Sequence, residues 1–212
     1  MSRAEKYSYL PAIFAIAVVL MAGIGTLTWA TDGWRIWTAE TARREAVLNH
    51  PKALPAVNLT DSHGRSVKLK HQSQLVVVDF IFTQCPTVCL AMGAQFRQLQ
   101  DQLSAEELSG QVRLLSLSFD PENDHQAQLT HYLSRFGAVD PYWKAARFDQ
   151  IEQLQDTLDQ LGVIVIPEPT LGFVHNAAFY LIEDGYVVGI YDVEELERLS
   201  DDIRLRANAL NS

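Results

Sequence analysis

The stretch LVVVDFIFTQCPTVCLAMGAQF, residues 75–96, joins a continuous apolar run to a segment with helical spacing. Residues 75–82 are rich in β-branched and aromatic side chains, which is typical of a strand buried on both faces. From residue 88 to residue 108 apolar side chains recur at the spacing of a helix, and Ser109-Gly110 ends the segment. The stretch therefore predicts a buried strand that leads through a short loop into a helix.

Strand and helix patterns alternate along the rest of the chain. Residues 56–71 predict an N-terminal β-hairpin, because two short alternating runs flank a turn at residues 61–64. The later segments are a strand at 112–119, helices at 124–136 and 151–161, a hairpin of strands at 173–182 and 186–192, and a closing helix at 193–209. This order predicts an α/β protein with a thioredoxin-like fold and an N-terminal β-hairpin extension.

Composition and charge set limits on the class of protein. The chain has 212 residues, of which 48% are hydrophobic and 20% charged, proportions that suit one globular domain of common size with an appendage. The formal net charge is −9, which argues against a nucleic acid as partner. We therefore expect one globular domain that binds no nucleic acid.

The appendage is an apolar segment near the N-terminus. Residues 7–31 carry no charged side chain and are long enough to cross a hydrocarbon core of roughly 30 Å, which takes about 20 helical residues. We expect one transmembrane anchor here. Aromatic residues near its two ends resemble interfacial anchors: Tyr7, Tyr9, Trp29, Trp34 and Trp37. A cleaved signal peptide is the alternative, although such peptides have a shorter apolar region of roughly 7 to 15 residues.

Four segments follow from this organisation: a cytoplasmic stub at 1–6, the transmembrane anchor at 7–31, a linker at 32–50, and a thioredoxin-like domain at 51–212. Basic residues flank both ends of the apolar segment, so their count does not decide its orientation. The short, signal-like start favours an N-terminus inside the cell. The domain would then face the periplasm or an equivalent compartment, where two cysteines can be oxidised to a disulfide.

Both cysteines of the chain belong to the opening stretch. We expect Cys85 on the loop after the strand and Cys89 in the first turn of the helix, so that the two sulfurs converge at a spacing of i and i+4. The positive end of the helix dipole should lower the pKa of these thiols. Three residues separate the cysteines, which leaves room for an ion. Two thiolates select Cu(I) or zinc, and an imidazole would complete a trigonal copper site.

The histidines differ in their setting. His175 lies where a loop enters the penultimate strand, and in a thioredoxin-like sheet that loop passes beside the start of the helix that carries the cysteines. His175 is therefore the candidate imidazole ligand. We expect the other five to be solvated surface residues: His50, His63, His71, His125 and His131. Met92, at helical spacing with Phe96, is expected in the core instead of at a metal site.

Three motifs together resemble the SCO/SenC family, membrane-anchored thioredoxin-like proteins of cytochrome c oxidase assembly. They are FTQCPTVC after the buried strand, SFDPENDH at the end of the next strand, and GFVHNAAFYLIEDG before the last helix, and the resemblance covers about residues 50 to 210. It implies copper bound by Cys85, Cys89 and His175, and delivery of copper to the CuA centre of the oxidase, or action on the thiols of that centre. Some members serve in copper homeostasis or redox signalling instead. With the anchor oriented as above, we expect a single-pass protein of the bacterial inner membrane with its domain in the periplasm.

The chain departs from the family's common motif at two positions. Many members have Cys-Pro-Asp-x-Cys-Pro, whereas this chain has Thr87 in place of the acidic residue and Leu90 in place of the second proline. All three expected ligands remain. Asp120, in SFDPENDH, could neighbour the site, or it could be a turn-forming residue before Pro121.

Two functions of different classes follow. The first is a copper-binding assembly factor with an exposed site, which transfers copper to a cytochrome c oxidase subunit or another copper-accepting protein. The second is an enzyme, a thiol-disulfide oxidoreductase in which Cys85 attacks a partner disulfide and Cys89 resolves the mixed disulfide. Thioredoxin-type reductases carry a proline before the penultimate strand, where this chain has His175-Asn176-Ala177 and no proline, and this favours the copper protein.

Overall fold

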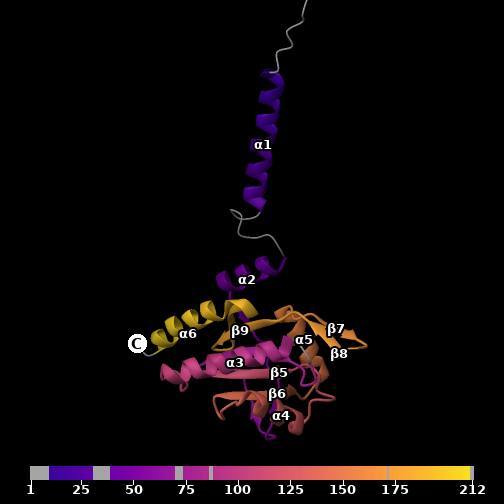
Figure 1. Ribbon diagram of the computed structural model, residues 1–212, viewed down its shortest axis with the longest axis vertical. Helices are drawn as coiled ribbons and strands as arrows, with labels where there is room; N and C mark the ends of the chain where they lie inside the picture. Colours follow the sequence, from indigo (N-terminus) through magenta and orange to yellow (C-terminus); the bar gives the residue numbers. More distant parts are fainter. Residues whose placement is uncertain (1–9, 31–38, 70–73, 86–87, 171, 211–212) are drawn as a thin grey trace, which may run out of the picture. The chain divides into compact units, whose positions relative to one another are not determined.

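The computed structural model describes residues 10–30, 39–69, 74–85, 88–170 and 172–210 (Figure 1). The chain divides into two compact units, with the boundary between Ala46 and Val47. Several predictions made from the sequence lie outside the described residues: the stub at 1–6, and the aromatic anchors Tyr7, Tyr9, Trp34 and Trp37. The division into stub, anchor, linker and domain stays a prediction.

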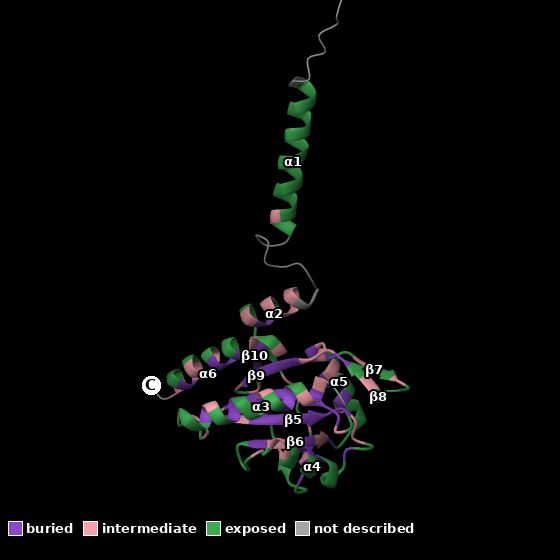
Figure 2. Ribbon diagram, viewed as in Figure 1, coloured by how far each residue is buried: buried purple, intermediate pink, exposed green. Residues whose placement is uncertain are grey.

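The N-terminal unit contains the helix α1, Leu10–Ala30. Its segment Pro11–Ala30 is long and apolar enough to cross a membrane by length and composition, a criterion that a signal sequence would also meet. Apolar side chains are exposed along most of α1, as the green ribbon in Figure 2 shows. The helix α2, Ala39–Asn49, lies within the predicted linker.

An eight-stranded sheet forms the centre of the second unit, in the order β1-β10-β9-β4-β5-β6-β2-β3. The pairs β4–β5 and β5–β6 are parallel, and the other pairs are antiparallel. The strands are β1 Lys52–Ala53, β2 Leu59–Asp61, β3 Ser66–Val67, β4 Leu75–Ile81, β5 Val112–Ser118, β6 Trp143–Phe148, β9 Ala178–Glu183 and β10 Tyr186–Asp192.

The strands predicted from the opening stretch and its neighbours are confirmed. Every residue of β4 is buried, as expected for a strand covered on both faces. The predicted N-terminal hairpin is formed by β2 and β3, and the predicted C-terminal hairpin by β9 and β10. The mixed α/β architecture is thus the thioredoxin-like fold with a hairpin extension.

Helices cover both faces of the sheet. The helices are α3 Val88–Ala105, α4 Gln126–Phe136, α5 Ile151–Leu161 and α6 Leu196–Leu210, the last preceded by a 3-10 turn at Val193–Glu195. Phe179 on β9 stacks on Phe96 of α3 at 5.2 Å between ring centroids, while the hydroxyl of Tyr180 donates to the Leu161 carbonyl of α5 at 3.5 Å. Because neighbouring residues of a strand point to opposite faces, α3 and α5 lie on opposite sides of the sheet.

The helix ends test the predicted stop signals. Gly137 and Gly162 end α4 and α5 in the left-handed conformation, both with φ 65°, as the sequence predicted. The end predicted for α3 near residue 108 is wrong, since α3 ends at Ala105. There Glu107 takes the left-handed conformation with φ 59°, and the N–H of Leu108 turns back to the Leu103 carbonyl at 2.9 Å. The chain therefore turns before it reaches Gly110.

Apart from the two-residue strand β1, two features of the second unit were not predicted. One is β6, which has no continuous apolar run because Lys144 and Arg147 interrupt it. The other is a separate two-stranded sheet of β7, Val165–Glu168, and β8, Gly172–His175. The strand predicted at 173–182 is therefore broken, with Asn176 and Ala177 between β8 and β9. Because of this break, His175 lies at the end of β8 and not on a strand of the central sheet.

Gly93 of α3 allows a close contact with α4. A Cβ added there would lie 2.5 Å from Cε2 and Cζ of the Phe136 ring. Gly93→Ala should reduce the free energy of unfolding by about 1–2 kcal/mol, because the steric cost exceeds the gain of about 1 kcal/mol in helix propensity. Urea unfolding measures the change. Gly110→Ala, with nothing within 4 Å of the added Cβ, is the control and should change stability by less than about 0.5 kcal/mol. An equal effect of both variants would contradict the steric explanation.

Candidate metal centre

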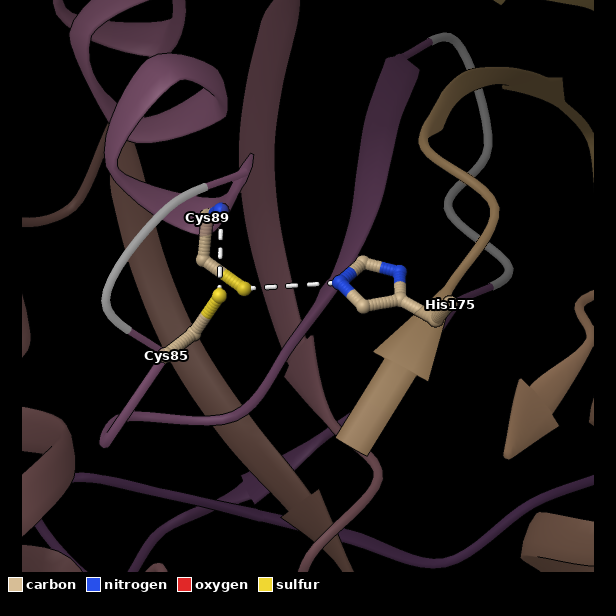
Figure 3. Close-up of side chains that lie close together, drawn as sticks. All are labelled: Cys85, Cys89 and His175. Carbon is tan, nitrogen blue, oxygen red and sulfur yellow. Dashed lines mark hydrogen bonds between the residues drawn. The ribbon is translucent and has the colours of Figure 1, made fainter. Parts of the chain in front are cut away.

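The loop between β4 and α3, called the cysteine loop because it carries Cys85, lies where the sequence predicted it. The strand β4 ends at Ile81, and the N–H of Cys85 donates to the Phe82 carbonyl at 3.1 Å. The helix α3 begins at Val88, so Cys89 is in its first turn. Pro86 and Thr87, the second of which departs from the family motif, lie outside the described residues. Strand end and helix start together hold the two cysteines on one short segment, as Figure 3 shows.

The structure brings His175 to the two cysteines. His175 is the last residue of β8, and its Nε2 lies 3.4 Å from the Sγ of Cys89. The backbone N–H of Cys89 donates to the Sγ of Cys85 at 3.3 Å. The candidate ligand atoms of the three residues all lie within 4.8 Å of one another, and Figure 3 shows both sulfurs and the imidazole pointing to one place. Residues 86 positions apart in the chain thus form one cluster of soft donors.

A backbone carbonyl sets the tautomer of His175. Its Nδ1 lies 3.1 Å from the carbonyl oxygen of Asn176. A carbonyl only accepts hydrogen bonds, so Nδ1 carries the proton, and Nε2 presents a lone pair toward Cys89. The side chain of Asn176 in turn accepts from the Ile164 N–H at 2.7 Å and donates to the Gly162 carbonyl at 3.0 Å. The imidazole is therefore oriented with its Nε2 toward the sulfurs.

Two phenylalanine rings lie beside the imidazole, and a third packs on both of them. The ring of Phe119 lies 5.0 Å from that of His175 between centroids, and the ring of Phe82 lies 6.5 Å away. Phe173 contacts both, at 5.3 Å from Phe82 and 5.6 Å from Phe119. A Cβ on Gly172, which has φ 82°, would meet the Phe82 ring at 3.4 Å. The aromatic cluster limits both the movement of His175 and the access of water to it.

Two predictions about the cysteines are wrong. The site was expected to be exposed, but Cys85 is 5% exposed, Cys89 1% and His175 9%. The helix dipole was expected to lower the thiol pKa, yet the pKa of Cys89 is raised, first by its hydrogen bond with Cys85 and second by burial. In the metal-free protein, the adjacent sulfur and the loss of solvent outweigh the helix dipole at Cys89.

The remaining candidates lie apart from the cluster. Four of the five other histidines are exposed, as predicted, and His71 lies outside the described residues: the exposed ones are His50, His63, His125 and His131. Met92 is fully buried in the core, also as predicted. Asp120 forms a turn, because its carboxylate accepts from Asn123 Nδ2 at 2.9 Å and its carbonyl accepts from the Asp124 N–H at 2.9 Å. The turn-forming alternative is thus the one that the structure shows.

Two fully buried aspartates were not singled out from the sequence. Asp124 accepts three hydrogen bonds beside the cysteine loop. Asp79 lies in the middle of β4, and within the described part of the chain neither of its carboxylate oxygens has a hydrogen-bond partner. In the sequence, Asp79 is an acidic residue within the apolar run LVVVDFIF, and Asp124 belongs to the polar stretch SFDPENDH. Neither pattern shows what the carboxylate contacts.

Solved structures share this fold. A SCO1/SenC family lipoprotein from Bacillus anthracis is 26% identical, with a TM-score of 0.66, over 74% of this chain and 97% of that one. BsSco, described as a member of the Sco family of cytochrome c oxidase assembly proteins with a disulfide switch, is also 26% identical, with a TM-score of 0.64, over 74% and 95% of the chains. ScoI from Bradyrhizobium japonicum, solved with copper bound, has a TM-score of 0.61 at 23% identity, over 72% and 98%.

Sequence comparison agrees with the structural likeness. The SCO1 protein homolog of Bacillus subtilis is 34% identical over 133 residues, which are 61% of this chain and 68% of that protein. The family model described as SCO1/SenC matches residues 48–204, which include both cysteines, His175 and nearly the whole second unit. The chain therefore belongs to the SCO1/SenC family.

Proposed function

We propose that this protein binds copper through the Sγ atoms of Cys85 and Cys89 and the Nε2 of His175, and passes it to a partner protein. The observation that carries the proposal is the convergence of these three atoms within 4.8 Å of one another. Ligand atoms about 2.0–2.3 Å from a metal ion in a trigonal arrangement lie roughly 3.5–4 Å apart. Small side-chain movements are enough to reach that geometry.

The kinds of donor favour copper over zinc. Two thiolates and one imidazole suit a trigonal Cu(I) site, whereas structural zinc sites have four protein ligands and zinc sites with three protein ligands add a water, which the burial of this cluster disfavours. Three such donors, and no fourth His, Cys, Asp or Glu, make up this cluster among the described residues. Copper bound to the related ScoI structure agrees with this choice.

Binding requires a change in protonation. Both thiols have to lose their protons, and the raised pKa of Cys89 makes this step unfavourable without a metal. The Nε2 of His175 is the ring nitrogen that faces the sulfurs, because Nδ1 is bonded to the Asn176 carbonyl. Copper uptake should therefore release protons from the cysteines.

We propose a CuA-type centre of a respiratory oxidase as the recipient. The support is membership in the SCO1/SenC family and the description of the related BsSco as one of the cytochrome c oxidase assembly proteins. We also propose that α1 is the anchor of a single-pass protein of the bacterial inner membrane. The stub at 1–6 would be cytoplasmic, the anchor would span 7–31, and the linker at 32–50 would lead to the domain at 51–212 in the periplasm.

The second candidate is an exported thiol-disulfide oxidoreductase. It is favoured by the closeness of the two sulfurs, which lie within 4.8 Å in the cluster. The burial of both cysteines and the raised pKa of Cys89 oppose it, since exchange needs an accessible thiolate. Cys89→Ser would trap a mixed disulfide between Cys85 and a partner if this were the function.

An anaerobic copper titration distinguishes the two functions. The detergent-solubilised, reduced full chain is titrated with Cu(I) against a competing chelator. We expect one tightly bound copper per chain, lost in the Cys85→Ser/Cys89→Ser double variant and kept in His131→Ala, which changes an exposed histidine of α4. Absence of competitive binding, together with a readily cycled Cys85–Cys89 disulfide, would reject the copper function in favour of the oxidoreductase.

A further inference from the structure

We propose that Asp124 is a positioning residue of the metal centre, whose single carboxylate holds in place both the loop with Cys85 and the strand end that packs on His175. The inference deepens the proposed copper function and rests on it. Asp124 lies outside the ligand cluster, in the turn that leads from β5 into α4.

The carboxylate of Asp124 accepts three hydrogen bonds from two other segments. Its Oδ1 accepts from the hydroxyl of Thr83 at 2.5 Å, and its Oδ2 accepts from the backbone N–H of Thr83 at 3.0 Å. Its Oδ2 also accepts from the hydroxyl of Ser118 at 2.6 Å. Asp124 itself is 0% exposed. Three segments therefore meet at one buried carboxylate: the loop after β4, the end of β5 and the start of α4.

Each bonded residue is next to part of the metal centre. Thr83 precedes Cys85 by two residues, in a loop closed by the hydrogen bond from the Cys85 N–H to the Phe82 carbonyl. Ser118 immediately precedes Phe119, whose ring lies 5.0 Å from the imidazole of His175. The same carboxylate thus fixes the approach of one thiolate ligand and the packing surface of the imidazole ligand.

The chemistry of the contacts requires an acceptor at this position. The partners are one N–H and two hydroxyl groups, and each donates to the carboxylate. Burial raises the pKa of Asp124, while the bonds from Ser118 and Thr83 act in the opposite direction. An amide has the same shape but only one acceptor oxygen and no charge, so Asp124→Asn can keep the bonds at Oδ2 but must reverse the bond to the Thr83 hydroxyl, and all three bonds lose the strength that the charged acceptor gives them. The loop should then be held less firmly without a change in side-chain volume.

Asp61 provides a matched control elsewhere in the domain. It is 1% exposed and also accepts three hydrogen bonds, from the N–H groups of His63 and Arg65 at 2.9 Å and from the Arg65 Nε at 3.0 Å. These bonds close the β2–β3 turn, and neither residue belongs to the metal cluster or to the aromatic cluster around it. Asp61→Asn therefore weakens a buried clamp with the same number of hydrogen bonds, together with the ion pairs of Asp61 to Arg65 and Lys144, and should destabilise the fold without moving the ligands.

The test compares Asp124→Asn and Asp61→Asn in the detergent-solubilised full chain. Three properties are measured: Cu(I) affinity against a chelator, the rate at which iodoacetamide alkylates the reduced, metal-free cysteines, and urea stability. Asp124→Asn should lower the copper affinity by about 10- to 100-fold, as loss of a supporting hydrogen bond does at other metal sites, and should accelerate alkylation. Asp61→Asn should change neither property while it lowers stability.

Thr83 gives a second pair of variants if Asp124→Asn does not fold. Thr83→Val removes the hydroxyl donor and should weaken copper binding, whereas Thr83→Ser keeps the donor and should restore it. Equal losses of affinity in Asp124→Asn and Asp61→Asn, or unchanged affinity and alkylation in Asp124→Asn and Thr83→Val, would overturn the positioning role. If the unmodified chain binds no copper, the proposed function fails, and the alkylation rates still decide whether Asp124 positions the cysteines.

Discussion

His175→Ala is expected to lower the copper affinity by more than about 100-fold, the upper end of the loss that follows removal of an outer-shell partner alone. The reason is that Nε2 of His175 is the only nitrogen donor of the cluster, and it faces the sulfurs. The thiols of Cys85 and Cys89 remain, so the reduction potential of their disulfide should change little. Chelator competition measures the affinity, and a glutathione redox titration of the same full-chain preparation measures the potential.

Two controls make the result specific to coordination. His131→Ala changes an exposed histidine and should leave affinity unchanged. Urea unfolding of His175→Ala shows whether loss of the imidazole disturbs its packing on Phe119 and Phe82. Unchanged copper affinity in a folded His175→Ala variant would remove His175 from the site and leave a two-thiolate centre.

Asp79→Asn is expected to stabilise the domain at pH 8 by up to about 4 kcal/mol and to have little effect at pH 4. Burial raises the pKa of Asp79 from 3.8 to about 7, and the side chain of Ser116 lowers it by a smaller amount. At about 1.4 kcal/mol per pH unit, that rise corresponds to roughly 4 kcal/mol. The cost arises because the folded protein has to hold an ionised carboxylate in a dry core.

The sign follows from the two protonation states. Well below the unfolded pKa of 3.8 the carboxyl group is protonated in both the folded and the unfolded chain, and its burial carries no charge penalty. As the pH rises toward 7, the unfolded chain ionises first, so the stability of the folded protein decreases and then levels off above the folded pKa. Urea unfolding of the full chain across pH 4–8 should show this decrease, and Asp79→Asn should remove it.

A surface aspartate is the control for Asp79. Asp101 on α3 has a side chain that is 60% exposed, and Asp101→Asn should leave the pH profile unchanged. If Asp79→Asn keeps the full pH dependence of the unmodified chain, then other groups cause it and the buried carboxylate is not the source. A loss of stability at pH 8 would show that Asp79 is paired in solution.

Local patterns were sufficient for the elements that carry the cysteines. The run of residues 75–82 predicted β4, and the helical spacing from residue 88 predicted the start of α3, because burial on two faces and helix amphipathicity both leave periodic traces in sequence. The same reasoning missed β6, since Lys144 and Arg147 interrupt its apolar run. It also predicted β8 and β9 as one strand. The residue between them, Asn176, bonds through its side chain to Gly162 and Ile164, and these contacts with a segment distant in sequence leave no local pattern.

The buried strand, the helix start and the i, i+4 spacing of Cys85 and Cys89 could all be derived from the order of residues alone. The part that His175 plays was inferred with help from family resemblance. Folding brings the three donors together in the interior with phenylalanine rings beside His175, raises the pKa of Cys89, and buries Asp124 and Asp79 in different states of hydrogen bonding, and none of this follows from the local pattern. These properties depend on which side chains surround a group, and burial and neighbouring charge come from segments that meet only when the chain folds.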